Sequence, residues 1–104
     1  MLGRPKTAEQ YVDLVDQALF EIEDLRAAAE YDMESMGAAM EFLEDLERDV
    51  RRLRDSMADG SYMFGKENLP FFKLAEKQDE RFLPFRQLLL KINETHINGL
   101  DAEG

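Results

Sequence analysis

The side chains of this sequence with the greatest capacity for chemistry are 23 carboxylates and a single histidine, His96. Carboxylates and imidazoles bind di-iron centres in helical bundles, where two Glu-x-x-His motifs place both ligands on one helix face. Glu94 precedes His96 by two positions rather than three, so this motif is absent. Calcium loops need alternating acids around a central glycine, which the sequence also lacks. We therefore expect no metal and no other cofactor, and a carboxylate metal-binding bundle is only the third alternative for function.

Covalent catalysis has no candidate residues. The chain has no cysteine, and there is no glycine-rich phosphate loop or dinucleotide fingerprint. His96 falls on the apolar face of the last predicted helix, which favours a structural role. We expect a protein with no catalytic activity of its own.

Acidic residues are concentrated in the first half of the chain. The net charge is −10, and thirteen acids but only one base, Arg26, lie between Glu9 and Glu47. Such a field repels phosphate backbones and anionic lipids and attracts basic partners. The acidic face that we expect on the first helix comprises Asp13, Asp16, Glu21, Glu23 and Asp24.

Three phenylalanines are candidates for contact with another protein. Phe20 lies opposite the apolar stripe, among acidic residues, where a large aromatic side chain is unexpected. Phe71 and Phe72 are adjacent in sequence, and two adjacent side chains do not both point into one core. Exposed aromatics mark interfaces, although burial within the monomer explains the three residues equally well. Phe20, Phe71 and Phe72 form the predicted interaction set.

The one basic cluster is a run of four arginines within 48–54. One turn of arginine beside an acidic surface is a weak footprint for nucleic acid. Folding the chain into a hairpin brings Arg51 near Asp16 and Arg54 near Asp13, where opposite charges attract. We therefore expect intramolecular ion pairs from Arg51 and Arg54, and no nucleic-acid partner.

A helical pattern positions these residues from 7 to 58. The segment contains one glycine and no proline, and Thr7-Ala8-Glu9-Gln10 fits a capping box. Apolar residues recur at heptad spacing, at positions 11, 15, 18, 22, 25, 29, 36, 39, 43, 46, 50, 53 and 57. This period predicts α-helix throughout the segment.

Asp32 interrupts the stripe and leaves two arrangements open. A continuous helix would be roughly 75 Å long and would need a partner chain along its length. A hairpin would reverse near 31–37, where Ser35 and Gly37 weaken the helix. The apolar stripe is wider than a coiled-coil seam, as in globular bundles. We therefore predict a hairpin of helices over about 7–33 and 36–58.

The remaining chain predicts a loop and two short helices. Gly60 suits a left-handed helix end, and the aromatic residues of 62–64 are expected to lie back on the hairpin. The tripeptide Leu-Pro-Phe occurs twice, at 69–71 and at 83–85. Proline fits the first turn of a helix, so each copy predicts a helix start, with a duplicated docking motif as the alternative.

The predicted fold class is therefore all-α: a long antiparallel helical hairpin packed by two short C-terminal helices over about 70–80 and 84–98. Residues 1–104 are expected to form a single domain with frayed ends at 1–6 and 100–104. No apolar run approaches the roughly 18 residues of a membrane span, and the N-terminus lacks the apolar stretch of a signal peptide. We expect a cytoplasmic protein with no membrane partner.

For function, the leading prediction is a small acidic protein–protein interaction module that binds another protein or a second copy of itself. A homodimer through the apolar stripe and a monomer whose C-terminal helices close that stripe both fit the pattern. The alternative is an acidic regulator or chaperone that shields a basic surface of a nucleic-acid-binding or secreted partner. The two differ in salt dependence, because exposed charges are screened over about 8 Å at physiological ionic strength.

Overall fold

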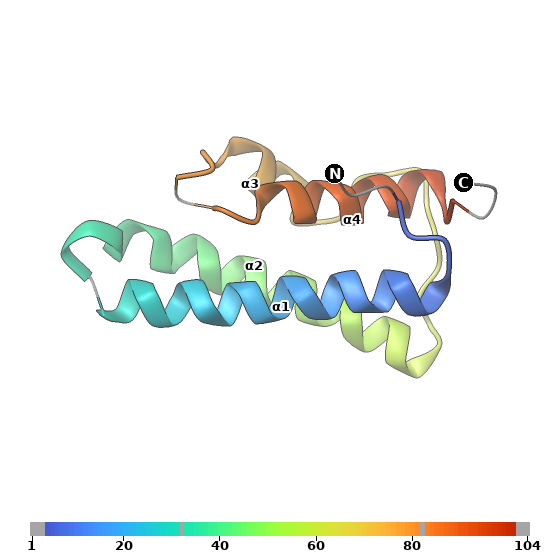
Figure 1. Ribbon diagram of the computed structural model, residues 1–104, viewed down its shortest axis with the longest axis horizontal. Coiled ribbons are helices and arrows are strands. Elements are labelled where there is room, and N and C mark those ends of the chain that lie inside the picture. The colour runs from blue at the N-terminus through green and yellow to red at the C-terminus, as the bar shows by residue number, and fades with distance from the viewer. Residues whose placement is uncertain (1–3, 32, 82, 102–104) are drawn as a thin grey trace.

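Four α-helices make up the fold (Figure 1). The computed structural model describes residues 4–31, 33–81 and 83–101, and for 33–40 it describes the backbone only. The helices are α1 (Ala8–Tyr31), α2 (Met33–Asp59), α3 (Phe72–Lys77) and α4 (Arg86–Asn98), and the described residues include no strand. The predicted all-α class is confirmed.

The two long helices form the predicted hairpin. α1 and α2 lie side by side in one layer, and α3 and α4 cover one face of it (Figure 1). The longest dimension of the fold is 46 Å, too short for the continuous helix that the heptad pattern also allowed. α2 already begins at Met33, earlier than predicted, and includes Ser35 and Gly37. Their helix propensities cost no more than about 1 kcal/mol each, too little to end a helix that packs along its length. Asp32 lies outside the described residues.

Local signals fix the ends of the long helices. The Thr7 hydroxyl accepts a hydrogen bond from the Gln10 backbone N–H at 3.1 Å, as the capping box predicts. The Gln10 side chain accepts from the Lys6 N–H, at 2.8 Å, one residue earlier than in a standard box. Gly60 follows α2 with a φ of 80°, the left-handed conformation that glycine adopts without steric cost.

Both Leu-Pro-Phe copies form the same turn. The N–H of the residue after the tripeptide donates to the leucine carbonyl at 3.0 Å in each case, Phe72 to Leu69 and Arg86 to Leu83. Leucine and phenylalanine are buried in each copy, and proline is exposed. The two stretches are thus the same way of starting a helix, and their apolar side chains are engaged within the fold.

α3 is shorter than predicted because Gln78 is already extended, with a ψ of 140°. The Arg86 side chain compensates the end of this helix by donating to the carbonyls of Ala75 and Glu76 at 3.1 and 3.3 Å. A cation near the last carbonyls stabilises a helix C-terminus.

The core lies where the hairpin meets the C-terminal helices. The buried heptad residues are Tyr11, Val15, Ala18, Ile22, Ala29, Leu43, Leu46, Val50 and Leu53. Leu83, Leu89 and Ile92 close the core from the α4 side with no exposed surface. The C-terminal helices therefore cover the apolar stripe within one chain.

A chain of hydrogen bonds ties the loop after α2 to α1 and α4. The Tyr11 hydroxyl donates to the Ile92 carbonyl at 3.1 Å, and it lies 3.0 Å from the Tyr62 hydroxyl. The Tyr62 hydroxyl in turn lies 2.7 Å from Nδ1 of His96. Phe64 stacks on Tyr11 with ring centroids 5.8 Å apart. Tyr62 and Phe64 therefore lie back on the hairpin as predicted.

Met63 does not follow its two neighbours, because 79% of its surface is exposed. The loop has no helix or strand at this point. Further along, the amide of buried Asn93 holds the next part of the loop. Its oxygen accepts from the Leu69 N–H at 2.7 Å, and its nitrogen donates to the Asn68 side chain at 2.9 Å.

The described parts of the two terminal segments are joined. The Asp101 N–H donates to the Pro5 carbonyl at 2.9 Å, and Pro5 is buried. Of the ends predicted to fray, residues 1–3 and 102–104 lie outside the described residues. Among the helices that the structure describes, none combines the length and apolarity needed to cross a bilayer.

Candidate protein interaction surface

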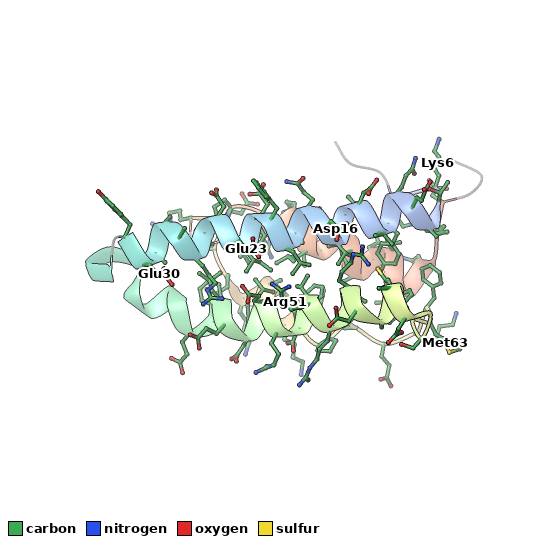
Figure 2. All side chains as sticks on the ribbon, turned by 90° about the horizontal axis from the view of Figure 1, so that it is seen from below. Lys6, Asp16, Glu23, Glu30, Arg51 and Met63 are labelled. Carbon is green, nitrogen blue, oxygen red and sulfur yellow. The ribbon has the colours of Figure 1, made fainter. Side chains whose placement is uncertain are left out.

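Arginines of α2 pair with acids along the edge of α1 that faces α2. Nε of Arg54 lies 2.6 Å from a carboxylate oxygen of Asp16, and Arg51 lies 3.6 Å from Glu23. Figure 2, which views the hairpin from the side opposite α4, shows Asp16, Glu23 and Arg51 between α1 and α2. The predicted partners were Asp13 for Arg54 and Asp16 for Arg51, so each arginine reaches an acid nearer the hairpin turn. Side-chain packing sets the offset between the two helices, which the position of the turn alone does not determine.

A further pair continues this edge toward the turn. Arg26 of α1 donates to the Glu47 carboxylate of α2 at 2.8 Å, which raises the pKa of Arg26 above its usual value. Glu47 also lies 3.8 Å from Arg51, so the pairs form a short network. We call this edge the ionic seam; its members are Asp16, Glu23, Arg26, Glu47, Arg51 and Arg54.

The other acids of α1 lie outside the ionic seam, although the charge of Glu30 still acts on Arg26. Of the seven carboxylates in α1, Asp16 and Glu23 belong to the ionic seam. The other five form no ion pair with any residue that the structure describes; they are Glu9, Asp13, Glu21, Asp24 and Glu30. The predicted acidic face is thus divided, with Asp13, Glu21 and Asp24 on the uncompensated side.

The three phenylalanines of the predicted interaction set have different environments. Phe20 is 64% exposed, between the acids one helical turn before and after it. Phe71 is 1% exposed and belongs to the core, so the prediction of a contact through Phe71 is corrected. Phe72 is half-buried. Phe71 is buried because the turn shared by both Leu-Pro-Phe copies directs the phenylalanine of each copy inward. Of the three side chains, Phe20 is the one that offers a large apolar surface to solvent.

Phe20 lies on the side of α1 turned away from the core. A helix advances 100° per residue, so Asp13, Phe20 and Asp24 fall within a narrow arc opposite Ala18 and Ile22. All three side chains are exposed, whereas Ala18 and Ile22 are fully buried. We call Asp13, Phe20 and Asp24 the outer face of α1.

A groove runs beside the outer face, between α1 and α4. Its volume is about 530 Å³, and it is lined by Asp13, Leu14, Gln17, Glu21, Phe85 and Leu88. Phe85 and Leu88 are buried in the core, and together with half-buried Leu14 they give the groove an apolar floor. Glu21 accepts a hydrogen bond from the Gln17 side chain at 2.8 Å. We call these six residues the α1–α4 groove.

The bases of α4 do not neutralise this groove. The Arg86 side chain is engaged with the carbonyls at the end of α3, and Lys91 lies 2.7 Å from Glu94 on its own helix. None of the six lining residues is basic. Asp13 and Glu21 therefore stand above an apolar floor with no cation beside them. The sequence predicted both acids, but it carried no signal that Phe85 and Leu88 would lie opposite them.

The remaining polar cluster, around His96, has a structural role. A hydroxyl has one hydrogen, so while Tyr11 donates to Ile92, Tyr62 donates to Tyr11 and His96 Nδ1–H donates to Tyr62. Burial raises the pKa of Tyr11 and Tyr62 and lowers that of His96, so all three side chains are neutral near pH 7. Their protons serve to hold the loop against α1 and α4.

Within the described part of the chain, no three His, Asp or Glu side chains converge to hold a metal ion. Comparison of the chain with protein-family models, with curated proteins and with solved structures found no match.

Proposed function

We propose that the protein is a small non-catalytic interaction module that binds a basic protein partner through the outer face of α1. The observation that supports it is Phe20, which is 64% exposed beside Asp24, a carboxylate that forms no ion pair with any residue that the structure describes; Asp16, one turn before Phe20, is paired with Arg54. Fully burying a phenylalanine side chain contributes about 1.5–3 kcal/mol, so an interface that covers Phe20 gains a large share of that free energy.

The charge of the outer face favours a partner of opposite sign. Two copies of α1 joined through this face would bring Asp13 and Asp24 of each against the same acids of the other, and like charges across an interface cost free energy. A basic partner instead places arginine or lysine beside these carboxylates. Arginine in particular also interacts favourably with an aromatic ring. We also propose that the protein is cytoplasmic and that its partner is a protein, not nucleic acid or a membrane.

The acidic regulator or chaperone is the second candidate, and the five unpaired carboxylates of α1 favour it. In that case charge alone attracts the partner, and Phe20 contributes little. Binding would weaken steeply with added salt, because exposed charges are screened over about 3 Å at 1 M salt. Binding through Phe20 would retain much of its strength.

Selection from a random peptide library on the purified protein separates these candidates. We expect enriched peptides to carry arginine or lysine beside at least one apolar residue. Phe20→Ser should lower their affinity about tenfold, equivalent to about 1.4 kcal/mol. Asp13→Asn with Asp24→Asn should act in the same direction.

The matched control is Glu44→Gln with Asp55→Asn, which removes two exposed charges from α2, neither of them in an ion pair. If the control weakens binding as much as the α1 variants do, the partner follows net charge and the outer face has no special role. Enriched peptides without basic residues would contradict the proposal.

A further inference from the structure

The α1–α4 groove lies directly beside the outer face and shares Asp13 with it. We infer that this groove binds an amphipathic helix of the partner, with two basic residues about two turns apart and apolar residues between them. The inference deepens the proposed function, since it names the partner element and the side chains that receive it.

The floor of the groove determines the apolar part of this motif. Leu14 of α1, Leu88 of α4 and Phe85, the residue before α4, line it, and no charged side chain other than Asp13 and Glu21 is among the lining residues. A volume of about 530 Å³ exceeds that of any single side chain, so the groove accommodates more than one residue of a partner. Two apolar side chains on one face of a helix, such as those at positions i+3 and i+4, fit such a floor.

The rim of the groove determines the basic part. Asp13 and Glu21 are eight residues apart on α1, which places their Cα atoms about 12 Å apart along the helix axis. A partner helix lying along the groove matches this separation with bases at positions i and i+7, about 10.5 Å apart on one face. The apolar residues at i+3 and i+4 then point at the floor between them. The expected motif is therefore basic-x-x-apolar-apolar-x-x-basic.

Two other possible occupants of the groove, a second copy of α1 and the basic segment of the chain itself, are less favourable. A second copy of α1 would bring acids to a rim that is already acidic. The basic segment of the chain itself is engaged elsewhere, because Arg51 and Arg54 belong to the ionic seam, on the side of the hairpin opposite α4 (Figure 2). A helix of a different, basic protein matches both the floor and the rim.

The test uses two synthetic helical peptides of identical composition. The first carries lysine at i and i+7 and leucine at i+3 and i+4, and in the second the same residues are permuted so that lysine and leucine occupy opposite faces. Titration of the ¹⁵N-labelled protein, followed by NMR, should show shifts at Leu14, Gln17, Glu21 and Leu88 with the first peptide. We expect it to bind about tenfold more tightly than the permuted peptide, since only in the first peptide do lysine and leucine share the face that contacts the groove.

Two charge reversals of equal size provide the matched variants. Glu21→Lys should weaken binding of the first peptide about tenfold, because it places a cation in the rim. Glu44→Lys makes the same charge change on the exposed face of α2 and should have less than about a twofold effect. The unfolding midpoints of both variants show whether the fold is retained.

Failure of this inference is distinguishable from failure of the proposed function. Equal affinity of the two peptides, or equal effects of the two reversals, would overturn the groove motif. Shifts at Phe20 and Asp24 without shifts at Leu14 and Leu88 would overturn the groove while leaving the outer face as the binding site. Peptides from the library that bind independently of Phe20, Asp13 and Asp24 would contradict the proposed function itself.

Discussion

The two edges of α1 carry the same kind of side chain but have different environments. On the ionic seam, Asp16 and Glu23 face arginines of α2 at 2.6 and 3.6 Å. On the edge toward α4, Asp13 and Glu21 border an apolar floor and have no base beside them. The difference comes from the neighbouring helices, since α2 directs its arginines at α1 and α4 uses Arg86 and Lys91 for its own contacts. One acidic helix thus contributes to hairpin association on one edge and keeps unpaired carboxylates on the other.

The largest effect on stability is expected when a buried apolar side chain is removed from α4. Leu89→Ala deletes a fully buried side chain, and such changes cost about 2–5 kcal/mol in the free energy of unfolding. Urea unfolding followed by circular dichroism measures it. Leu90→Ala, on the half-buried neighbour, is the control and should cost clearly less. A loss below about 1 kcal/mol for Leu89→Ala would mean that α4 contributes little to the fold.

The second test concerns His96, which joins α4 to the loop. Burial lowers its pKa below the ordinary 6.5, so the unfolded chain binds a proton at a higher pH than the folded chain does. The contribution of His96 to stability is therefore complete above about pH 6.5 and is lost as pH falls through its folded-state pKa. We expect a lower urea midpoint at about pH 5.5 than at about pH 7.5.

His96→Gln should flatten this pH dependence. Hydrogen bonds from Ser61 lower the pKa of Asp59 below 3.8, and those from Arg81 lower the pKa of Asp79 below the same value. These two carboxylates therefore change protonation only at more acidic pH. An unchanged slope in the His96→Gln variant would assign the pH dependence to another group.

The smallest effect is expected on the ionic seam. Arg54→Met keeps most of the length of the side chain and removes its charge, and a partly exposed pair contributes about 0.2–1 kcal/mol. Arg52→Met is the control, because Arg52 is exposed on the same helix and forms no ion pair with a described residue. The difference between the two variants should shrink at about 1 M salt. If Arg54→Met lowered the free energy of unfolding as much as Leu89→Ala does, the ionic seam would contribute as much to stability as apolar burial on the α4 side.

Several features could be predicted from the sequence because short-range chemistry determines them. The capping box at Thr7, the left-handed end at Gly60 and the helix starts after the two Leu-Pro-Phe copies each depend on residues within one or two turns. The heptad positions predicted the buried face of α1 because helical geometry assigns each residue to a side. The position of Phe20 opposite that face followed from the same geometry, whereas its exposure, which the sequence left open, depends on how the C-terminal segments pack.

Other features required contacts between distant segments. The pairing of Arg54 with Asp16 rather than Asp13 depends on the offset between α1 and α2. The burial of Phe71 and the hydrogen bonds of Asn93 depend on how the loop before α3 meets α4. No local pattern signals such contacts, because their partners lie 24 or more positions away in the chain.

The sequence by itself determined the helices, the side of α1 that is buried and the acidic character of the opposite side, since each follows from residue type and the 3.6-residue period. Only the tertiary structure decided which of those acids are neutralised. Asp13 and Asp16 are three residues apart and chemically identical, yet Asp16 lies 2.6 Å from an arginine of α2 and Asp13 lines the groove against α4. The charge that a carboxylate offers to a partner depends on which helix packs beside it, and packing brings together residues that are far apart in sequence.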